Sequence, residues 1–270
     1  MKNSNIGYSD ISQSIAIDDD NEGFEKRMSF DLETKSFVYY TKNMEFIVKS
    51  ITSKELMCLN SMIAEYSNRI CSPEGSYMAK IFGLFKVKID GSKAIRVIIT
   101  ENLGSRLNSP IKFALSGYLG QRISSMRTST HDLNELLRDS IYNDQDFIET
   151  IGCININSTD LLSIIKKIKR DTLLLRKSLI LEYTLLVLTE QSMSLKSTII
   201  DKNFVTGNSN LIVFIGIDNF LQVFDSKKKM TKSERGMTDK YFGVDEYSPK
   251  SYRKRFLYMV KNIFRAQSIN

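Results

Sequence analysis

One apolar run near the middle of the chain constrains the fold more than any other feature. SLILEYTLLVLTEQ, residues 178–191, contains no proline or glycine and is rich in leucine and other aliphatic residues. The run predicts a buried strand over residues 181–190. Glu182 lies inside it, where an unpaired carboxylate costs several kcal/mol or takes up a proton. This acid therefore either meets water at the start of the strand or lies in a cleft.

The periodicity on either side of residue 103 predicts two lobes. Before it we expect strands at 28–42, 44–51, 77–90 and 93–102, a helix at 53–70 capped by Ser53, and a tight turn at Asp90-Gly91. Beyond it we expect helices at 131–140, 144–151, 158–176 and 249–265 and strands at 181–190 and 210–217. The fold class is therefore α+β, with an antiparallel sheet in the first lobe. The expected divisions are a polar acidic tail (1–27), an N-terminal lobe (28–103) and a C-terminal lobe (104–270).

Several classes of chemistry lack the residues they need. The three cysteines are widely spaced, so neither a disulfide framework nor a zinc site is predicted. The only histidine, His131, opens an expected helix, which argues against a catalytic triad that would depend on it. The sequence shows no signal peptide and no apolar run near the roughly 18 residues that span a bilayer. We therefore expect a cytoplasmic protein, peripheral at a membrane surface or part of a large assembly.

The positive charge is concentrated at the C-terminal end. The net charge is +7, and residues 226–270 hold 12 Lys/Arg against 4 Asp/Glu. Such a surface attracts phosphates, anionic lipids, nucleic acid or an acidic partner. No zinc-finger, helix-turn-helix or RNA-binding pattern accompanies the charge, so nucleic acid is the least supported of these. The most concentrated basic loop contains Lys227, Lys228, Lys229 and Lys232.

Seven stretches, taken in order, resemble the phosphatidylinositol phosphate kinase family. They are MEFIVKSI, YMAKIFGLFKVKI, IKFALSGYLGQR, YNDQDF, IKRDTLLLRKSLILEYTLLV, LIVFIGIDNFLQVFDSKKKM and SPKSYRKRFLYMV, which together span roughly residues 40–265. The resemblance implies a two-lobed kinase-like fold with ATP between the lobes and a phosphoinositide headgroup as substrate. It also implies that the 227–232 loop contacts the membrane. The family's ATP-contacting lysine corresponds to Lys49, and Arg122 lies in the third stretch.

At four places this chain departs from the resembled family. Glu182 stands where the family has its catalytic aspartate, and Asn219 where it has the aspartate that holds magnesium. Asp218, one residue earlier, points to the opposite face of a regular strand. In the third stretch, Ser116 stands where the family has a lysine, and Ala114, two residues earlier, stands where it has an aspartate. The stretch MSFDLETKS, which corresponds to the phosphate-covering loop, contains no glycine to allow close backbone approach.

These departures favour a pseudokinase that acts as a structural or binding subunit of a larger assembly or at a membrane surface. One alternative is an active phosphoinositide kinase that transfers the ATP γ-phosphate to a phosphatidylinositol phosphate. In that case Glu182 acts as the catalytic carboxylate, Asp218 or Asp144 carries Mg²⁺ near the family's magnesium position at Asn219, and Lys49 with Arg122 holds phosphates. The other is a nucleotide-independent adaptor for anionic lipid or an acidic protein partner. The sequence leaves these alternatives open.

Overall fold

The chain forms two compact units in the computed structural model. The structure describes residues 13–14, 27–31, 36–88, 90–91, 93–108, 110–117, 141–191, 204–206, 211–222 and 248–267. The first unit consists of Met1–Leu56 and Ala79–Arg106, and the second of Met57–Met78 and Leu107–Asn270. The sequence predicted a single lobe boundary, near residue 103. In the structure the chain crosses from one unit to the other three times, because residues 57–78 belong to the second unit.

The first unit is built on an antiparallel five-stranded sheet. Its order is β1-β2-β3-β5-β4. The strands are β1 (Met28–Asp31), β2 (Ser36–Tyr40), β3 (Phe46–Ser50), β4 (Ile81–Val87) and β5 (Ile95–Glu101). Residues 28–42 are thus two paired strands and not one, as the sequence had suggested. Gly91, in the predicted turn between β4 and β5, has φ +79°, a conformation that glycine adopts without a steric cost.

Helix α3 (Ser53–Ile70) has the predicted bounds, but Thr52 caps it and not Ser53. The Thr52 hydroxyl accepts a bond from the Glu55 N–H, and the Glu55 carboxylate accepts from the Thr52 N–H at 2.7 Å. This reciprocal pair is a capping box. Later in the helix, Tyr66 stacks on Phe220 of the second unit. That contact is part of the reason why the helix, from Met57 onward, groups with that unit.

The second unit has a mixed five-stranded sheet in the order β10-β11-β9-β6-β7. Its strands are β6 (Ile111–Leu115), β7 (Ile141–Tyr142), β9 (Thr184–Gln191), β10 (Phe204–Thr206) and β11 (Leu211–Asp218). Only β7 pairs in parallel, with β6. The central strand β9 is almost fully buried from Leu185 to Thr189, which confirms the apolar run as a core strand. β6, which sequence periodicity missed, is its direct neighbour.

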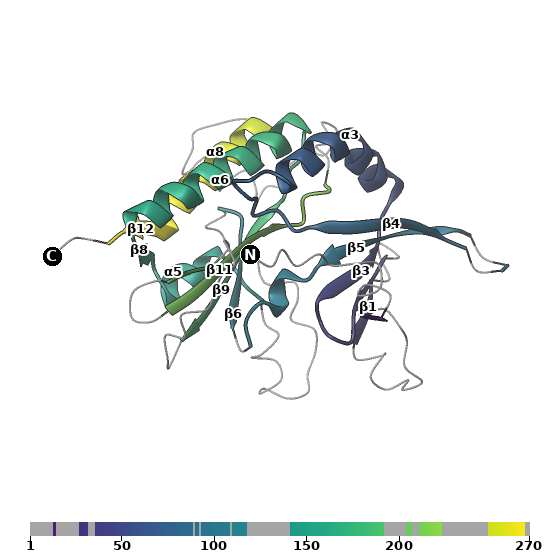
Figure 1. The fold of residues 1–270 in the computed structure, drawn as a ribbon, viewed down its shortest axis with the longest axis horizontal. Coiled ribbons are helices and arrows are strands. Elements are labelled where there is room, and N and C mark those ends of the chain that lie inside the picture. Colours follow the sequence, from purple (N-terminus) through teal and green to yellow (C-terminus); the bar gives the residue numbers. More distant parts are fainter. Residues whose placement is uncertain are drawn as a thin grey trace. The chain divides into compact units, whose positions relative to one another are not determined.

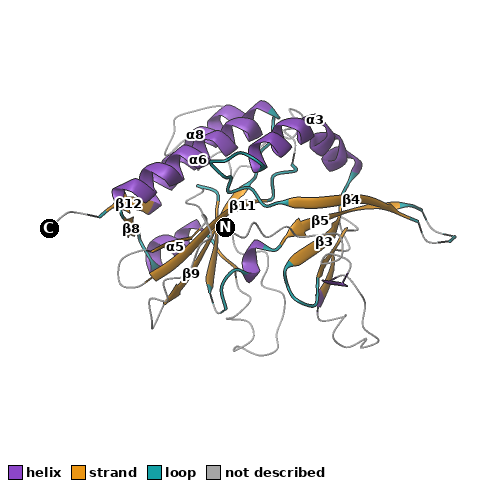
Figure 2. Cartoon of the chain, in the orientation of Figure 1, coloured by secondary structure: helices purple, strands orange, loops and turns teal. Residues whose placement is uncertain are grey.

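Besides the part of α3 from Met57 onward, the second unit contains three described helices. They are α5 (Asp144–Thr150), α6 (Ser158–Lys177) and α8 (Pro249–Ile263). In Figure 1, α6 and α8 run alongside each other, and the two helices pack together. Figure 2 shows that short strands follow α5 and α8; β8 (Ile154–Ile156) pairs in parallel with β12 (Phe264–Ala266). The last helix therefore ends two residues before its predicted end. Among the described residues, no helix is both long and apolar enough to cross a bilayer.

Candidate functional site

Three strands of the second unit bring the predicted site residues to one end of the sheet. β6 ends beside the start of β9, with Leu115 opposite Leu185. β11 ends at the same place, with Asp218 opposite Thr184. Beyond these pairs the Leu181 N–H donates to the Gln222 carbonyl at 3.0 Å. Residues that follow β6, precede β9 and end β11 therefore meet at this end of the sheet.

Glu182 lies outside the strand in which the sequence placed it. β9 begins at Thr184, and Glu182 has φ +60° in the connection from α6. Its side chain is half-buried. Leu179, in the same connection, has φ +57°. Left-handed backbone at a non-glycine residue costs about 1–3 kcal/mol and persists only where the surroundings enforce it. Glu182 therefore lies two residues before β9 rather than within it.

The backbone also turns between Asp218 and Asn219. Asp218 is the last residue of β11 and is half-buried, while Asn219 is exposed with φ +58°. The Oδ1 atom of Asp218 accepts a bond from the Asn219 N–H at 2.8 Å. The strand alternation that would send the two side chains to opposite faces ends here. One Asp218 oxygen already serves this turn.

Ser116, directly after β6, is held by a buried carboxylate. Its N–H and its hydroxyl lie 3.0 Å and 3.3 Å from Oδ2 of Asp144, and the Gly117 N–H lies 2.8 Å from Oδ1. Asp144 is 6% exposed and opens α5. Burial raises the pKa of the Asp144 carboxyl above its ordinary value, although the bonds from Ser116 and Gly117 and the charge of Arg255 act to lower it. Ser116, which stands where the resembled family has a lysine, thus makes an internal structural contact with Asp144.

Residues from four of the seven resembled stretches pack around this carboxylate. Gly117 has φ +80°, and a Cβ there would lie 3.1 Å from Cγ of Arg255 on α8. The guanidinium of Arg255 lies over the ring of Tyr252, 4.7 Å from its centroid. The Tyr252 hydroxyl donates to the carbonyl of Tyr183, the residue after Glu182. Segments distant in sequence thus form one buried cluster behind the sheet end.

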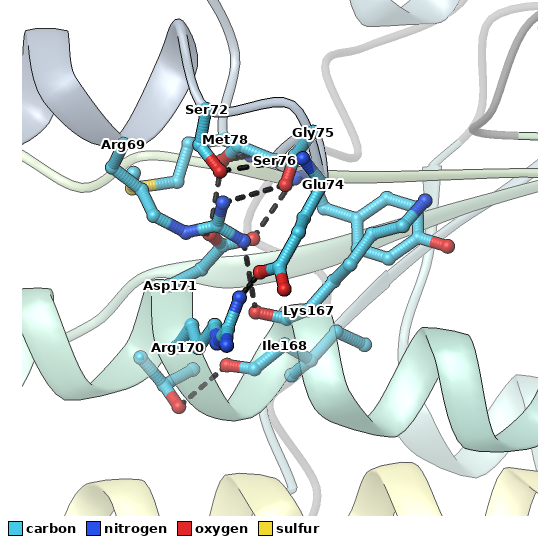
Figure 3. A network of polar contacts seen from close by, with 12 residues as sticks. Arg69, Ser72, Glu74, Gly75, Ser76, Met78, Lys167, Ile168, Arg170 and Asp171 are labelled. Carbon is cyan, nitrogen blue, oxygen red and sulfur yellow. Dashed lines mark hydrogen bonds and ion pairs between the residues drawn. The ribbon is translucent and has the colours of Figure 1, made fainter.

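A second buried network supports the same sheet end from the other side. Asp171 of α6 is fully buried, and Nε of Arg69 on α3 lies 2.7 Å from its Oδ1. The Ser76 hydroxyl and the Tyr77 N–H each donate to Asp171 at 2.9 Å. The Tyr77 carbonyl accepts from the Ile217 N–H at 2.6 Å, one residue before Asp218. Figure 3 shows Arg69 and the 72–76 turn converging on Asp171. Asp171 thereby fixes the segment that lies along the end of β11.

Burial raises the pKa of the Asp171 carboxyl, against the lowering effects of the Tyr77 N–H, the Arg69 charge and the Ser76 hydroxyl. Asp171 lies in the fifth resembled stretch, IKRDTLLLRKSLILEYTLLV, but the sequence assigned this residue no role. A signal was present in α6, where the buried face includes Ile164, Ile168 and Leu175. Asp171 lies on that face at helical spacing, so it needed a buried partner. The partner, Arg69, could not be found from spacing because it lies about a hundred residues earlier.

The remaining predicted site residues fall elsewhere. Lys49 is half-buried on β3 in the first unit, paired with Val38 on one side and Ile98 on the other. Arg122 lies outside the described residues. So do the basic residues Lys227, Lys228, Lys229 and Lys232 and the predicted helix at 131–140.

The described part of the sheet end fits a magnesium ion poorly. Mg²⁺ demands near-ideal octahedral oxygen ligands and is usually held by one or two carboxylates together with substrate phosphates. Here Asp218 already accepts a backbone bond, and its neighbour Asn219 offers an uncharged amide. No group of three or more His, Cys, Asp or Glu side chains suited to a metal occurs among the described residues. The described strands β1 and β2 likewise contain no glycine for a phosphate-covering turn.

Comparison with known proteins gives one consistent result. The family model for phosphatidylinositol-4-phosphate 5-kinase matches residues 26–207, more than half of the chain. A probable phosphatidylinositol phosphate kinase of Dictyostelium discoideum is 29% identical over 154 residues, which cover 56% of this chain and 20% of that protein. Phosphatidylinositol 4-phosphate 5-kinase 5 of Arabidopsis thaliana is 28% identical over 165 residues, 60% of this chain and 20% of that protein.

Human phosphatidylinositol 5-phosphate 4-kinase type-2 beta is 23% identical over 148 residues, 54% of this chain and 34% of that protein. The matched region thus spans only 20–34% of these three relatives' own length.

Proposed function

Since the chain belongs to the phosphatidylinositol-4-phosphate 5-kinase family, we propose that it is a pseudokinase that acts as a binding or structural subunit. The observation that carries the proposal is at Ser116. At the position of the family lysine, this chain has a buried serine whose N–H and hydroxyl both bond to Asp144. A phosphate-binding cation is replaced by a contact that holds β6 to α5.

The neighbouring positions support the same proposal. Phosphoryl transfer depends on positioning and on neutralising charge, and a misplacement of about 1 Å can cost about a hundredfold in rate. Glu182 is one methylene longer than aspartate and sits on left-handed backbone before β9. Asn219 carries no charge for a cation. Each change removes a different requirement of one reaction, so no single compensating change restores it.

The alternative, an active phosphoinositide kinase, has one observation in its favour. Glu182 and Asp218 are both half-buried and come from adjacent strand ends. In this alternative Glu182 orients the attacking hydroxyl, and Lys49 and Arg122 bind phosphates. ATP and magnesium would then be cofactors and a phosphatidylinositol phosphate the substrate.

Calorimetric titration with ATP, with and without magnesium, tests the proposal. A pseudokinase without a nucleotide site gives no magnesium-dependent heat up to millimolar ATP. The variant Glu182→Asp/Asn219→Asp should then be assayed on phosphatidylinositol phosphate vesicles. Activity that appears only in this variant supports a lost reaction. Activity in the unaltered chain refutes the pseudokinase and establishes the alternative.

For the partner, we propose an anionic phosphoinositide membrane, with an acidic protein as the competing candidate and a larger assembly as the setting. The support is the excess of basic residues over 226–270 in the sequence. Each basic residue near an anionic surface contributes on the order of 1 kcal/mol at low salt. Sedimentation with phosphoinositide vesicles should therefore recover the chain, and neutralising Lys227, Lys228 and Lys229 should release it. Unchanged sedimentation of that variant refutes a role for the loop.

A further inference from the structure

The strand β4 forms an edge of the first unit's sheet with a regular division of side-chain chemistry. Within the described residues it pairs only with β5, so its outer side adjoins no other strand. The last two pairs, Lys86 with Arg96 and Val87 with Ile95, lie beyond the end of β3. The Ile51 N–H, directly after β3, still donates to the Arg96 carbonyl at 2.9 Å, so the hairpin continues as a two-stranded ribbon only beyond Arg96. Figure 1 shows this extension next to the β4 label.

One face of the β4–β5 hairpin has exposed apolar side chains toward its free end. Phe85 pairs with Val97 and Val87 with Ile95, and cross-strand partners point to the same side of a sheet. Phe85 is 44% exposed, Val87 39% and Ile95 42%. The Phe85 ring lies back over Gly83, where an added Cβ would be 2.5 Å from a ring carbon. Three neighbouring apolar side chains of this size on one exposed face indicate a contact surface.

The opposite face carries basic side chains beyond the exposed Leu84. Lys86 pairs with Arg96, and Lys88 follows Val87. Across residues 80–96 the sequence holds five Lys or Arg and one acid, Asp90. In the described part of the chain no carboxylate pairs with any of these five bases; Arg96 donates to the Ser53 hydroxyl at 3.3 Å. Within the described residues, no carboxylate therefore offsets the positive charge of Lys86, Lys88 and Arg96.

We propose that β4 binds an extended peptide in which acidic and apolar residues alternate, added as a sixth strand of this sheet. An edge strand offers main-chain N–H and C=O groups to an incoming strand, and pockets for alternate side chains set specificity. The alternation of the peptide would place its apolar residues beside Phe85 and Val87 and its acids beside Lys86 and Lys88. The inference does not depend on whether the chain is catalytic.

Two other occupants fit these observations less well. A second copy of this chain would bring Lys86 and Lys88 against like charges, which is how natural edge strands prevent self-pairing. A lipid bilayer would attract the bases, but its hydrocarbon cannot satisfy the outward backbone groups of an edge strand. An acidic, alternating strand satisfies the backbone, the charge and the apolar face together.

The test uses the full chain and a fluorescent peptide in which glutamate alternates with valine. We expect saturable binding at low salt by fluorescence anisotropy, weakened by added salt. Reversing two exposed charges in Lys86→Glu/Lys88→Glu should weaken binding about tenfold or more. Lys254→Glu, an exposed charge reversal on α8, is the matched control and should bind as the unaltered chain does.

Two N-methylated versions of the peptide test strand addition directly. Methyl groups on alternate amides block one edge of the peptide or the other, so one version should lose binding and the other should keep it. Equal binding of both, equal loss in Lys254→Glu, or no binding of any peptide overturns the proposal. Vesicles that contain phosphatidylserine and sediment the chain through Lys86 and Lys88, without peptide binding, would assign the surface to lipid. A dimer that the same double variant disrupts would assign it to a second copy.

Discussion

Removing the carboxylate of Asp171 should be among the most damaging substitutions in the chain. Asp171→Ala leaves the Arg69 guanidinium, 10% exposed, without its counter-ion, and leaves the Tyr77 N–H and the Ser76 hydroxyl without their acceptor. Hydrogen bonds to a charged group contribute about 1.5–3 kcal/mol each, but members of one network are not additive. Breaking a buried ion pair by removing one partner costs about 3–5 kcal/mol. We expect the free energy of unfolding to fall by about 4 kcal/mol.

The same network supplies a matched control. Glu74 pairs with Arg170 on the surface, where the two side chains are 39% and 46% exposed. Exposed ion pairs contribute about 0–1 kcal/mol, so Glu74→Gln should change stability little. Urea denaturation followed by circular dichroism compares the two variants. Amide exchange in peptides containing Tyr77 and Ile217 localises the effect, because the Ile217 N–H donates to the Tyr77 carbonyl. If Asp171→Ala costs no more than Glu74→Gln, the reasoning is wrong.

Two further predictions follow from the buried cluster around Asp144. Gly117→Ala should destabilise the chain by about 1–3 kcal/mol more than Gly91→Ala, by denaturation midpoint, because both have positive φ but only Gly117 lacks room for a Cβ. The carboxyl carbons of Asp144 and Asp171 should titrate above the ordinary aspartate pKa of 3.8 in an NMR titration. A raised pKa in the folded state means that the native state binds protons more tightly than the unfolded state. The contribution of the two carboxyls to stability should therefore decrease as pH rises from 3.8 through the folded pKa and stay constant above it. NMR inflections at or below 3.8 would contradict the raised pKa values.

The sequence predicted the long regular elements well and the strand ends poorly. Helices α3, α5 and α6 lie within one residue of their predicted bounds, because caps and apolar spacing are local signals. The start of β9 was misplaced because the apolar run continues through Leu181 and Tyr183, although the backbone turns at Glu182. Strand propensity carries no information on such a left-handed residue. β6 was missed because five residues are too few for a clear period.

The site was predicted as a set of positions, and its connections were not. The structure places Ser116, Glu182 and Asp218, which come from three of the resembled stretches, at one end of the sheet. The partners that hold that end, Asp144 and Asp171, act through contacts with residues from 27 positions away (Gly117) to 102 positions away (Arg69) in sequence. Pairings at such separations depend on tertiary packing. A buried acid in an apolar pattern indicates that it has a polar or charged partner, but the local pattern does not identify that partner.

The positions that match the resembled family and those that depart from it differ in what they do in the fold. Gly117, Asp144, Tyr183 and Arg255 lie in the resembled stretches outside the departures, and each is engaged in internal packing or hydrogen bonding. By the resemblance, the departing positions near the sheet end are those at which the family has a charged residue: Ala114, Ser116, Glu182 and Asn219. Changes in the first set would destabilise the fold, because Asp144 is a buried carboxylate and a Cβ at Gly117 would meet Arg255. In the second set, Glu182 is half-buried and Asn219 is exposed, and Ser116 contributes a contact to Asp144 in place of a charge. A chain that is required to fold and bind, but not to transfer a phosphoryl group, needs only the first set. This division supports the proposed pseudokinase more strongly than any one substitution does.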